Sequence, residues 1–231
     1  MMSETLFFTA VHGNEGFSIS IIERLAKQFD FEWLVANPEA LAQNRRFIDI
    51  DLNRSGPGNS NSKLLEECLA FRLIQKGREY QRVIDIHGTT ANTGVFIIIG
   101  DPNWQNIELA KKFDVANVVL WPGLLPTGPL CQFIPNSLEI ECGPKDSPDT
   151  SQELTRVLTE FFNKQPPTVT QRYFIVTGKL IGVNPTGLRD FQEITIGNNT
   201  FYPLLAGQYA EISCYMMQKL NNDKINYVKS R

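Results

Sequence analysis

Two histidines and a glutamate could form a metal centre. The sequence of 231 residues contains only two histidines, His12 and His87. Glu15 stands three residues after His12 in the motif His-Gly-Asn-Glu, and His87 closes the motif Asp-Ile-His. Two histidines and one glutamate, with a fourth position left open, are a ligand set of catalytic zinc sites. We therefore predict that His12, Glu15 and His87 bind one zinc ion, which would lower the pKa of bound water to about 7 and polarise a carbonyl oxygen.

A pair of acids in a later segment could transfer protons at such a centre. Glu139 and Glu141 lie two residues apart in the segment 137–142. Because side chains alternate along a β-strand, a strand here would point both carboxylates to the same face. Glu141 stands near the end of the segment, and a carboxylate beside zinc can take a proton from bound water. Glu141 is therefore the candidate general base, and Glu139 is the nearest alternative.

The segment 45–54, Arg-Arg-Phe-Ile-Asp-Ile-Asp-Leu-Asn-Arg, concentrates arginines between the two histidine motifs. Arginine binds a carboxylate through two parallel hydrogen bonds. The segment therefore favours an acidic or carboxylate-bearing substrate. The next residues, 55–62, are rich in Gly, Ser and Asn, which predicts a flexible loop that borders the site.

Predicted strands alternate with predicted helices over the first two thirds of the chain. Apolar runs predict strands at 5–11, 31–36, 82–86, 94–99, 116–121 and 137–142. Apolar residues at helical spacing predict helices at 16–29, 63–80, 103–113 and 148–163. This alternation favours an α/β fold with a mixed, mostly parallel central sheet flanked by helices. In such folds, sites form beyond the carboxyl ends of strands, where both histidine motifs fall.

The pattern changes after Pro166 and Pro167. Short β-like runs at 173–176 and 193–196 are separated by Gly, Asn and Pro. We predict two domains, a zinc-hydrolase catalytic domain over residues 1–165 and a small β-rich C-terminal lobe over residues 166–231.

Composition excludes several classes of partner. Lys and Arg number 22 against 25 Asp and Glu, so the net charge of −3 disfavours nucleic-acid binding. No apolar run approaches the roughly 20 residues of a membrane span, and no secretory signal opens the chain. The four cysteines form no Cys-x-x-Cys pair, which predicts reduced thiols in a cytoplasmic protein. Whether the chain forms a homo-oligomer is left open.

Five motifs together resemble one protein family. They are His-Gly-Asn-Glu at 12–15, Asn-Pro-Glu-Ala at 37–40, the arginine segment 45–54, Asp-Ile-His-Gly-Thr-Thr at 85–90 and Glu-Ile-Glu-Cys-Gly-Pro at 139–144. Their order and spacing resemble the aspartoacylase and succinylglutamate desuccinylase family, which belongs with the zinc carboxypeptidases. The resemblance covers about residues 5–165. It implies a zinc-carboxypeptidase-like fold and a zinc-dependent hydrolysis of the amide bond of an N-acyl amino acid, a small-molecule substrate.

The resemblance also implies roles for single residues. Glu141 would act as the general base and then as the general acid. Arg46 would polarise the scissile carbonyl and stabilise its oxyanion. Asp51 would orient His12, since a carboxylate commonly fixes a histidine that binds zinc.

The same resemblance places the substrate. Asn53 and Arg54 would hold its α-carboxylate. Tyr209, in the segment Gln-Tyr-Ala-Glu, would be a substrate-contacting tyrosine contributed by the C-terminal lobe.

One departure from the family concerns a second substrate carboxylate. Members that act on acylated aspartate carry an additional arginine about ten residues before the general base, whereas this chain has no arginine between Arg82 and Arg156. The corresponding segment, 128–133, instead offers three residues without a cation: Leu130, Cys131 and Phe133. We therefore expect N-acyl amino acids with neutral or apolar side chains to be preferred to N-acetylaspartate, unless Arg45 or Lys145 supplies a replacement charge or the loop 55–62 reshapes the pocket.

Two other functions use much of the same apparatus. A zinc carboxypeptidase acting on short peptides would need the same ligands and base. A non-catalytic carboxylate-binding protein could retain the fold, although the complete set of ligands and base argues against it. Hydrolysis of a panel of N-acyl amino acids would distinguish these possibilities.

Overall fold

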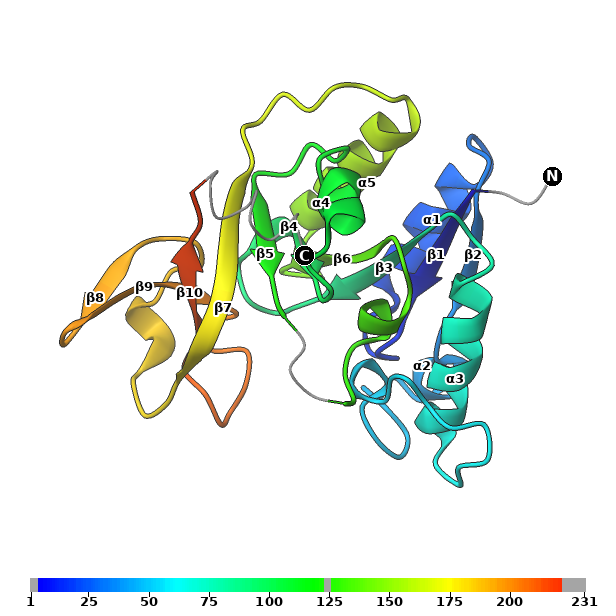
Figure 1. Cartoon of the computed structure of the whole chain (residues 1–231), viewed down its shortest axis with the longest axis horizontal. Helices are drawn as coiled ribbons and strands as arrows, with labels where there is room; N and C mark the ends of the chain where they lie inside the picture. The colour runs from blue at the N-terminus through cyan, green and yellow to red at the C-terminus, as the bar shows by residue number, and fades with distance from the viewer. Residues whose placement is uncertain (1–3, 123–125, 222–231) are drawn as a thin grey trace.

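The computed structural model describes residues 4–122 and 126–221. Their strands form one mixed sheet in the order β2-β1-β3-β6-β4-β5-β7-β10-β9-β8 (Figure 1). The strands of the first part are β1 (Thr5–Thr9), β2 (Glu32–Val35), β3 (Arg82–Gly88), β4 (Gly94–Ile99), β5 (Asn117–Leu120) and β6 (Ser137–Gly143). Their pairings are parallel except that β4 runs antiparallel to β6. This arrangement confirms the predicted mixed, mostly parallel central sheet.

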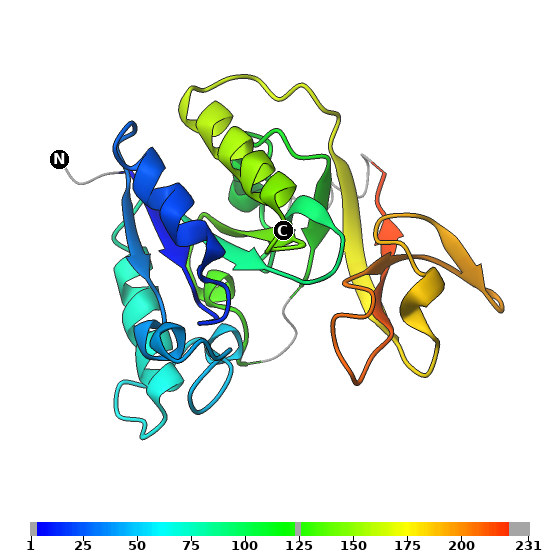
Figure 2. The same ribbon diagram turned by 180° about the vertical axis from the view of Figure 1, so that it is seen from behind.

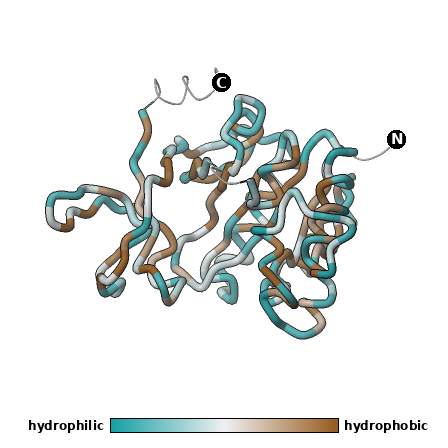
Figure 3. The backbone as a smooth tube through the Cα atoms, turned by 60° about the horizontal axis from the view of Figure 1, so that its bottom comes forward, coloured by the Kyte–Doolittle hydropathy of each residue, from teal (hydrophilic) through white to brown (hydrophobic). Residues whose placement is uncertain are grey.

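Helices flank both faces of this sheet, as predicted. The helices that pack on one face are α1 (Ile19–Leu25), α4 (Trp104–Ala110) and α5 (Pro148–Phe162). The other face is covered near β1 and β3 by α3 (Leu65–Gly77) (Figures 1 and 2). Hydrophobic residues are concentrated along the central strands, and hydrophilic residues dominate the outer loops (Figure 3). Each fully buried leucine or phenylalanine of these interfaces contributes roughly 1.5–3 kcal/mol of transfer free energy.

Two local differences from the sequence-based expectation have clear causes. The helix predicted for 16–29 begins as a 3-10 turn, η1 (Gly16–Ser18), and the regular helix α1 ends at Leu25. Phe29 lies beyond the end of this helix but still packs against the core, where its ring stacks on Phe162 with centroids 4.9 Å apart. Its apolar character therefore extended the predicted helix too far. A short helix, α2 (Pro38–Ala42), was not predicted, although Asn37 caps it by accepting a hydrogen bond from the Ala40 N–H.

The C-terminal lobe consists mainly of antiparallel strands. Its strands are β7 (Arg172–Leu180), β8 (Ile194–Ile196), β9 (Asn199–Leu204) and β10 (Cys214–Lys219). The sequence predicted part of β7 and the whole of β8, but neither β9 nor β10. β9 begins with two exposed polar residues and contains Pro203, and β10 ends with two exposed polar residues, so neither strand shows a clear two-residue apolar alternation.

The lobe continues the main sheet, since β7 pairs in parallel with β5 and antiparallel with β10. Its strands lie at the opposite end of the sheet from β2 (Figures 1 and 2). The division into 1–165 and 166–231 falls between α5 and β7 and stays a prediction. Among the described residues, no helix is both long and apolar enough to cross a membrane.

Candidate active site

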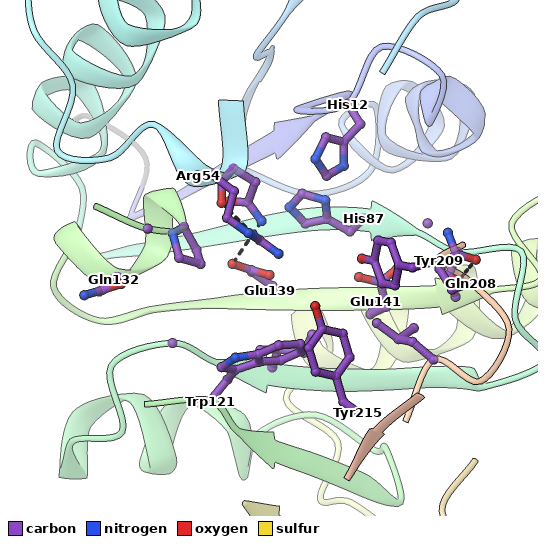
Figure 4. Close-up of a pocket in the computed structure, with 18 of the residues that line it drawn as sticks. His12, Arg54, His87, Trp121, Gln132, Glu139, Glu141, Gln208, Tyr209 and Tyr215 are labelled. Atoms are coloured by element: carbon purple, nitrogen blue, oxygen red, sulfur yellow. Dashed lines mark hydrogen bonds between the residues drawn. The ribbon is translucent and has the colours of Figure 1, made fainter. Parts of the chain in front are cut away.

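Strand alternation brings polar side chains together on one face of the sheet. On β6, Leu138 and Ile140 join the core on the α5 side, whereas Glu139 and Glu141 face the opposite side and line a cavity. β3 is the parallel neighbour of β6, and its His87 is in register with Glu141. The cavity has a volume of about 470 Å³ and lies between the α3 side of the sheet and the C-terminal lobe (Figure 4).

Most of the predicted site residues meet in this cavity. The eight of them that line it are His12, Glu15, Arg46, Asn53, Arg54, His87, Glu141 and Tyr209. Asp51, the ninth, instead contacts His12 and Arg46. The loop 55–62 contributes none of the described residues that line the cavity, but it contacts one of them. Gly56 in this loop pairs with Gly128 by two backbone hydrogen bonds.

The turn after β1 places His12 and Glu15 in the cavity. The Glu15 N–H donates to the His12 carbonyl oxygen at 2.9 Å, which closes a tight turn. Gly13 lies against α2 so closely that a Cβ at this position would lie 2.1 Å from the Ala40 carbonyl carbon. A glycine is therefore required between the histidine and the glutamate, and the His-Gly-Asn-Glu motif has a steric as well as a chemical basis.

The three predicted zinc ligands share one small volume. Nδ1 of His12 lies 2.9 Å from Oε1 of Glu15, and Nδ1 of His87 lies 3.3 Å from Oε2 of the same carboxylate. One ligand atom from each of the three residues can be chosen so that all lie within 4.8 Å of one another. All three side chains are buried.

The other nitrogen of each imidazole is held by a separate carboxylate. Nε2 of His12 lies 3.0 Å from Oδ1 of Asp51, and Nε2 of His87 lies 3.0 Å from Oδ2 of Asp85. Both rings therefore turn Nδ1 toward Glu15. Paired carboxylates of this kind orient histidines and increase their basicity in metal sites. The donor set fits a divalent metal such as zinc, because two oriented imidazoles and one carboxylate converge.

Charges at this cluster oppose the effect of burial. Burial lowers the pKa of His12 and of His87, but the carboxylates beside them outweigh it, so the pKa of His12 is raised and that of His87 is raised well above 6.5. Burial alone would raise the pKa of Glu15, but the two histidines hold it well below 4.5. These shifts favour protonated histidines in the metal-free protein, and because a metal binds the neutral imidazole, metal binding would compete with protons here.

The carboxylates of Asp51 and Glu66 hold the arginine segment 45–54 in place. Nε and Nη2 of Arg46 donate to Oδ2 of Asp51 at 3.1 and 2.9 Å, while Nη1 lies 3.6 Å from Glu15. The buried carboxylate of Glu66 accepts hydrogen bonds from the backbone N–H groups of Ile48, Asp49 and Ile50. Sequence reasoning missed Glu66, since an acid in the first turn of a helix gives no local sign of a partner in another loop.

Glu141 and Glu139 occupy different surroundings on the same strand. Burial raises the pKa of Glu141 to about 8, an effect that His87 opposes and the neighbouring acids Glu15 and Glu139 increase. Glu139 is 4% exposed, and its pKa is raised first by burial and then by Asp85. Figure 4 shows Glu139 beneath Arg54 and Glu141 closer to Tyr209.

The predicted carboxylate-binding residues are partly engaged by the protein. The amide of Asn53 donates to Glu139 at 3.5 Å and accepts from the Leu130 N–H at 3.2 Å. Arg54 donates through Nη1 to the Asn53 carbonyl oxygen at 2.6 Å, and its side chain lines the cavity. Asn53 is therefore fixed in place, and Arg54 is the more open of the two.

The wall formed by residues 128–133 differs from the expectation. Leu130 and Cys131 are fully buried in the short helix η3 (Leu130–Phe133) and do not line the cavity, and Phe133 does not line it either. The residues that do are Gly128, Pro129 and Gln132. The sequence predicted a segment without a cation but not which of its residues line the cavity, because the 3-10 turn buries the consecutive side chains of Leu130 and Cys131.

Arg45 and Lys145 do not line the cavity either. Lys145 bonds to Asp146, and Arg45 is exposed. A lysine that sequence reasoning missed, Lys179 of β7, reaches the cavity wall instead and lies over the Tyr215 ring at 5.7 Å from its centroid.

Comparison with known proteins is consistent with this geometry. Residues 2–123 match the model of the succinylglutamate desuccinylase/aspartoacylase catalytic domain, which is more than half of the chain. The chain belongs to the succinylglutamate desuccinylase/aspartoacylase family. The range that matches the family model includes all three predicted zinc ligands but ends before Glu141.

Relatives and solved structures of this family resemble the chain over different extents. A "probable aspartoacylase" of Prochlorococcus marinus subsp. pastoris is 30% identical over 158 residues, which cover 62% of this chain and 54% of the relative. Another, of Trichodesmium erythraeum, is 32% identical over 116 residues, covering 43% of this chain and 40% of the relative. The chain thus spans about half the length of the curated relatives it matches.

The fold is shared with solved members of the family. The crystal structure of murine aminoacylase 3 superposes with a TM-score of 0.75 at 17% identity, covering 95% of this chain and 96% of that one. The succinylglutamate desuccinylase from Chromobacterium violaceum gives a TM-score of 0.69 at 15% identity, covering 95% and 85%. At these identities the likeness establishes the fold.

Proposed function

We propose that the chain is a zinc-dependent amidohydrolase that cleaves an N-acyl amino acid into a carboxylic acid and a free amino acid. The observation that carries the proposal is the convergence of His12, Glu15 and His87 in one cavity, with Glu141 in register beside His87. Family membership supports the reaction class. His12, Glu15 and His87 would hold the zinc, which when bound supplies an acidified water and polarises a carbonyl oxygen.

The side chains around this centre divide the remaining work. The Glu141 carboxylate takes a proton from the attacking water and passes it to the leaving amine nitrogen. Arg46 keeps Nη1 directed toward the cluster, because its other two nitrogens are bonded to Asp51, and it donates to the developing oxyanion. Arg54 binds the free α-carboxylate, Asn53 supports it from a fixed position, and Tyr209 closes the substrate site from the C-terminal lobe.

A hydrolysis screen tests the proposal. The zinc-loaded protein is incubated with N-acetyl and N-succinyl derivatives of several amino acids and with short peptides, and the release of free amine is measured. Cleavage of an N-acyl amino acid in preference to the peptides supports the proposal. Preferential peptide cleavage would identify a carboxypeptidase, and zinc binding without any hydrolysis would favour a non-catalytic carboxylate-binding protein.

A further inference from the structure

The loop 205–213 of the C-terminal lobe carries Tyr209 and reaches the end of β3. Within the lobe, the loop is closed by a hydrogen bond from the Gly207 N–H to the Ser213 carbonyl oxygen at 3.0 Å. Among the described residues, the hydrogen bonds that join this loop to the part of the chain before residue 166 all end on one atom, Oε1 of Gln208.

Three donors converge on that oxygen. The hydroxyl of Thr89 donates at 2.8 Å, the N–H of Thr90 at 3.0 Å and the hydroxyl of Thr90 at 2.6 Å. A backbone N–H can only donate, so the amide of Gln208 must turn its oxygen toward Thr90. The orientation of this side chain is therefore fixed by chemistry.

The donors stand on a rigid base. Thr89 is 2% exposed, its N–H donates to the Cys142 carbonyl oxygen within β6, and its carbonyl oxygen accepts from the Lys145 N–H just beyond β6. It lies two residues after His87 in the sequence. Gln208 thus ties the loop to the strand ends that carry the candidate metal ligand and the candidate base.

Tyr209 directly follows this tie. Its ring lines the cavity, burial raises its pKa to about 12, and it meets the ring of Tyr215 edge-on with centroids 6.0 Å apart. Figure 4 shows Gln208 and Tyr209 together at the side of the cavity nearest Glu141. Packing against Tyr215 positions Tyr209 within its own lobe, whereas Gln208 positions it relative to the first part of the chain.

We propose that Gln208 is a positioning residue: by accepting three hydrogen bonds from Thr89 and Thr90, it holds the loop 205–213, and with it Tyr209, against the substrate cavity. Its consequence for catalysis rests on the proposed function, but the tie itself does not. Because Tyr209 is assigned to substrate binding and not to the chemical step, loss of the tie should act on KM more than on kcat.

Amide hydrogen exchange gives a direct readout. Gln208→Met keeps the length of the side chain and removes the acceptor, so the Thr90 N–H should exchange on the order of tenfold faster. Gln208→Glu keeps acceptor oxygens and should restore slow exchange. Gln218→Met is the matched control, since the Gln218 side chain donates to the Thr200 carbonyl oxygen within the lobe, and its loss should leave exchange at Thr90 unchanged.

Kinetics give the second readout. With an N-acyl amino acid that the wild type cleaves, Gln208→Met should raise KM on the order of tenfold with little change in kcat, and Gln208→Glu should recover most of the loss. Thr90→Val removes one of the hydroxyl donors to Gln208 and should reproduce part of the rise in KM. It replaces Gln208→Met in this test if that variant fails to fold. Unchanged Thr90 exchange, or unchanged KM in an active Gln208→Met enzyme, would overturn the proposal. A wild type without hydrolytic activity would instead contradict the proposed function, and exchange at Thr90 would still decide whether Gln208 holds the loop.

Discussion

Glu141 is the register partner of His87 on neighbouring parallel strands. Side chains in register on adjacent strands project from the same face a few ångströms apart, so the candidate base stands directly beside a candidate metal ligand. This relationship is a property of the sheet and needs no loop to maintain it. His87 and Glu141 are therefore held by the sheet itself, whereas His12 and Glu15 are held by the turn after β1.

The first prediction concerns the metal. His87→Ala removes one of three converging ligands and should lose most of the bound zinc while the fold survives. Asp85→Asn is the matched comparison, because it keeps every ligand and removes only the carboxylate that orients His87. It should retain zinc with an affinity lower by roughly 10–100-fold. Metal analysis of the purified variants measures both, and full zinc occupancy in His87→Ala would exclude His87 as a ligand.

The second prediction concerns the base. Glu141→Gln preserves shape but cannot take a proton, so kcat should fall by roughly 10²–10⁴ with zinc content unchanged. Glu139→Gln is the control on the same face of the same strand. Glu139 faces Asn53, and its substitution should affect KM more than kcat. If Glu139→Gln shows the larger loss of kcat, Glu139 and not Glu141 is the general base.

The third prediction follows from the raised pKa of Glu141 and concerns the metal-free protein. Between the ordinary value of 4.5 and about 8, the folded chain binds a proton at Glu141 that the unfolded chain has released. This group therefore lowers stability as pH rises through that window. Glu141→Gln removes the effect, so its melting temperature should match that of the wild type near pH 4.5 and exceed it increasingly toward about pH 8. A difference independent of pH, measured in the presence of a chelator, would show that Glu141 has an ordinary pKa.

Strand positions and their neighbouring motifs were the predictable part of this molecule. The run around His12 and the segment 137–142 carry enough apolar residues to predict strands, and the alternation within them correctly placed Glu139 and Glu141 on one face. The convergence of the candidate metal ligands could be predicted because both histidines stand at or near the ends of such runs, where sites form.

Residues that act through distant partners could not be predicted in the same way. Glu66, Gln208 and Lys179 contact groups from 16 to more than 100 residues away along the chain or line a cavity shared with another element. No local spacing encodes such contacts. The prediction of which residues at 128–133 face the cavity was wrong for a related reason. A single 3-10 turn decides which side chains point into the cavity, and the conformation of this turn depends on packing against α3.

The fourth prediction concerns the α-carboxylate of the substrate. Arg54 lines the cavity and can bind a carboxylate with a planar pair of donors that lysine lacks. Arg54→Lys should therefore lower kcat/KM on the order of tenfold or more although the charge is kept. Arg45→Lys, at an exposed position outside the cavity, serves as the control. A substrate amidated at this carboxylate should be poor for the wild type and should lose little more in Arg54→Lys. Equal turnover of the acid and amide forms by the wild type would refute this role.

The last prediction concerns the side chain of the amino acid that is released. The wall offers Gly128, Pro129 and Gln132, none of which is a cation. A second substrate carboxylate there would be desolvated without a close cation, which costs several kcal/mol in apolar surroundings. Lys179 lines the same cavity but is exposed, so water screens its attraction.

We therefore expect kcat/KM for N-acetylleucine or N-acetylmethionine to exceed that for N-acetylaspartate by at least about tenfold, since an unpaired buried charge discriminates strongly. Lys179 is the one lysine that lines the described cavity, and Lys179→Met tests whether it binds the second carboxylate. Lys111→Met, at an exposed position outside the cavity, is the control. The neutral substrates should be cleaved equally well by the wild type and both variants. A wild-type preference for N-acetylaspartate that Lys179→Met abolishes would show that Lys179 replaces the missing arginine. The same preference surviving Lys179→Met would mean that another group of the cavity, such as Gln132, Arg46 or Arg54, binds the second carboxylate.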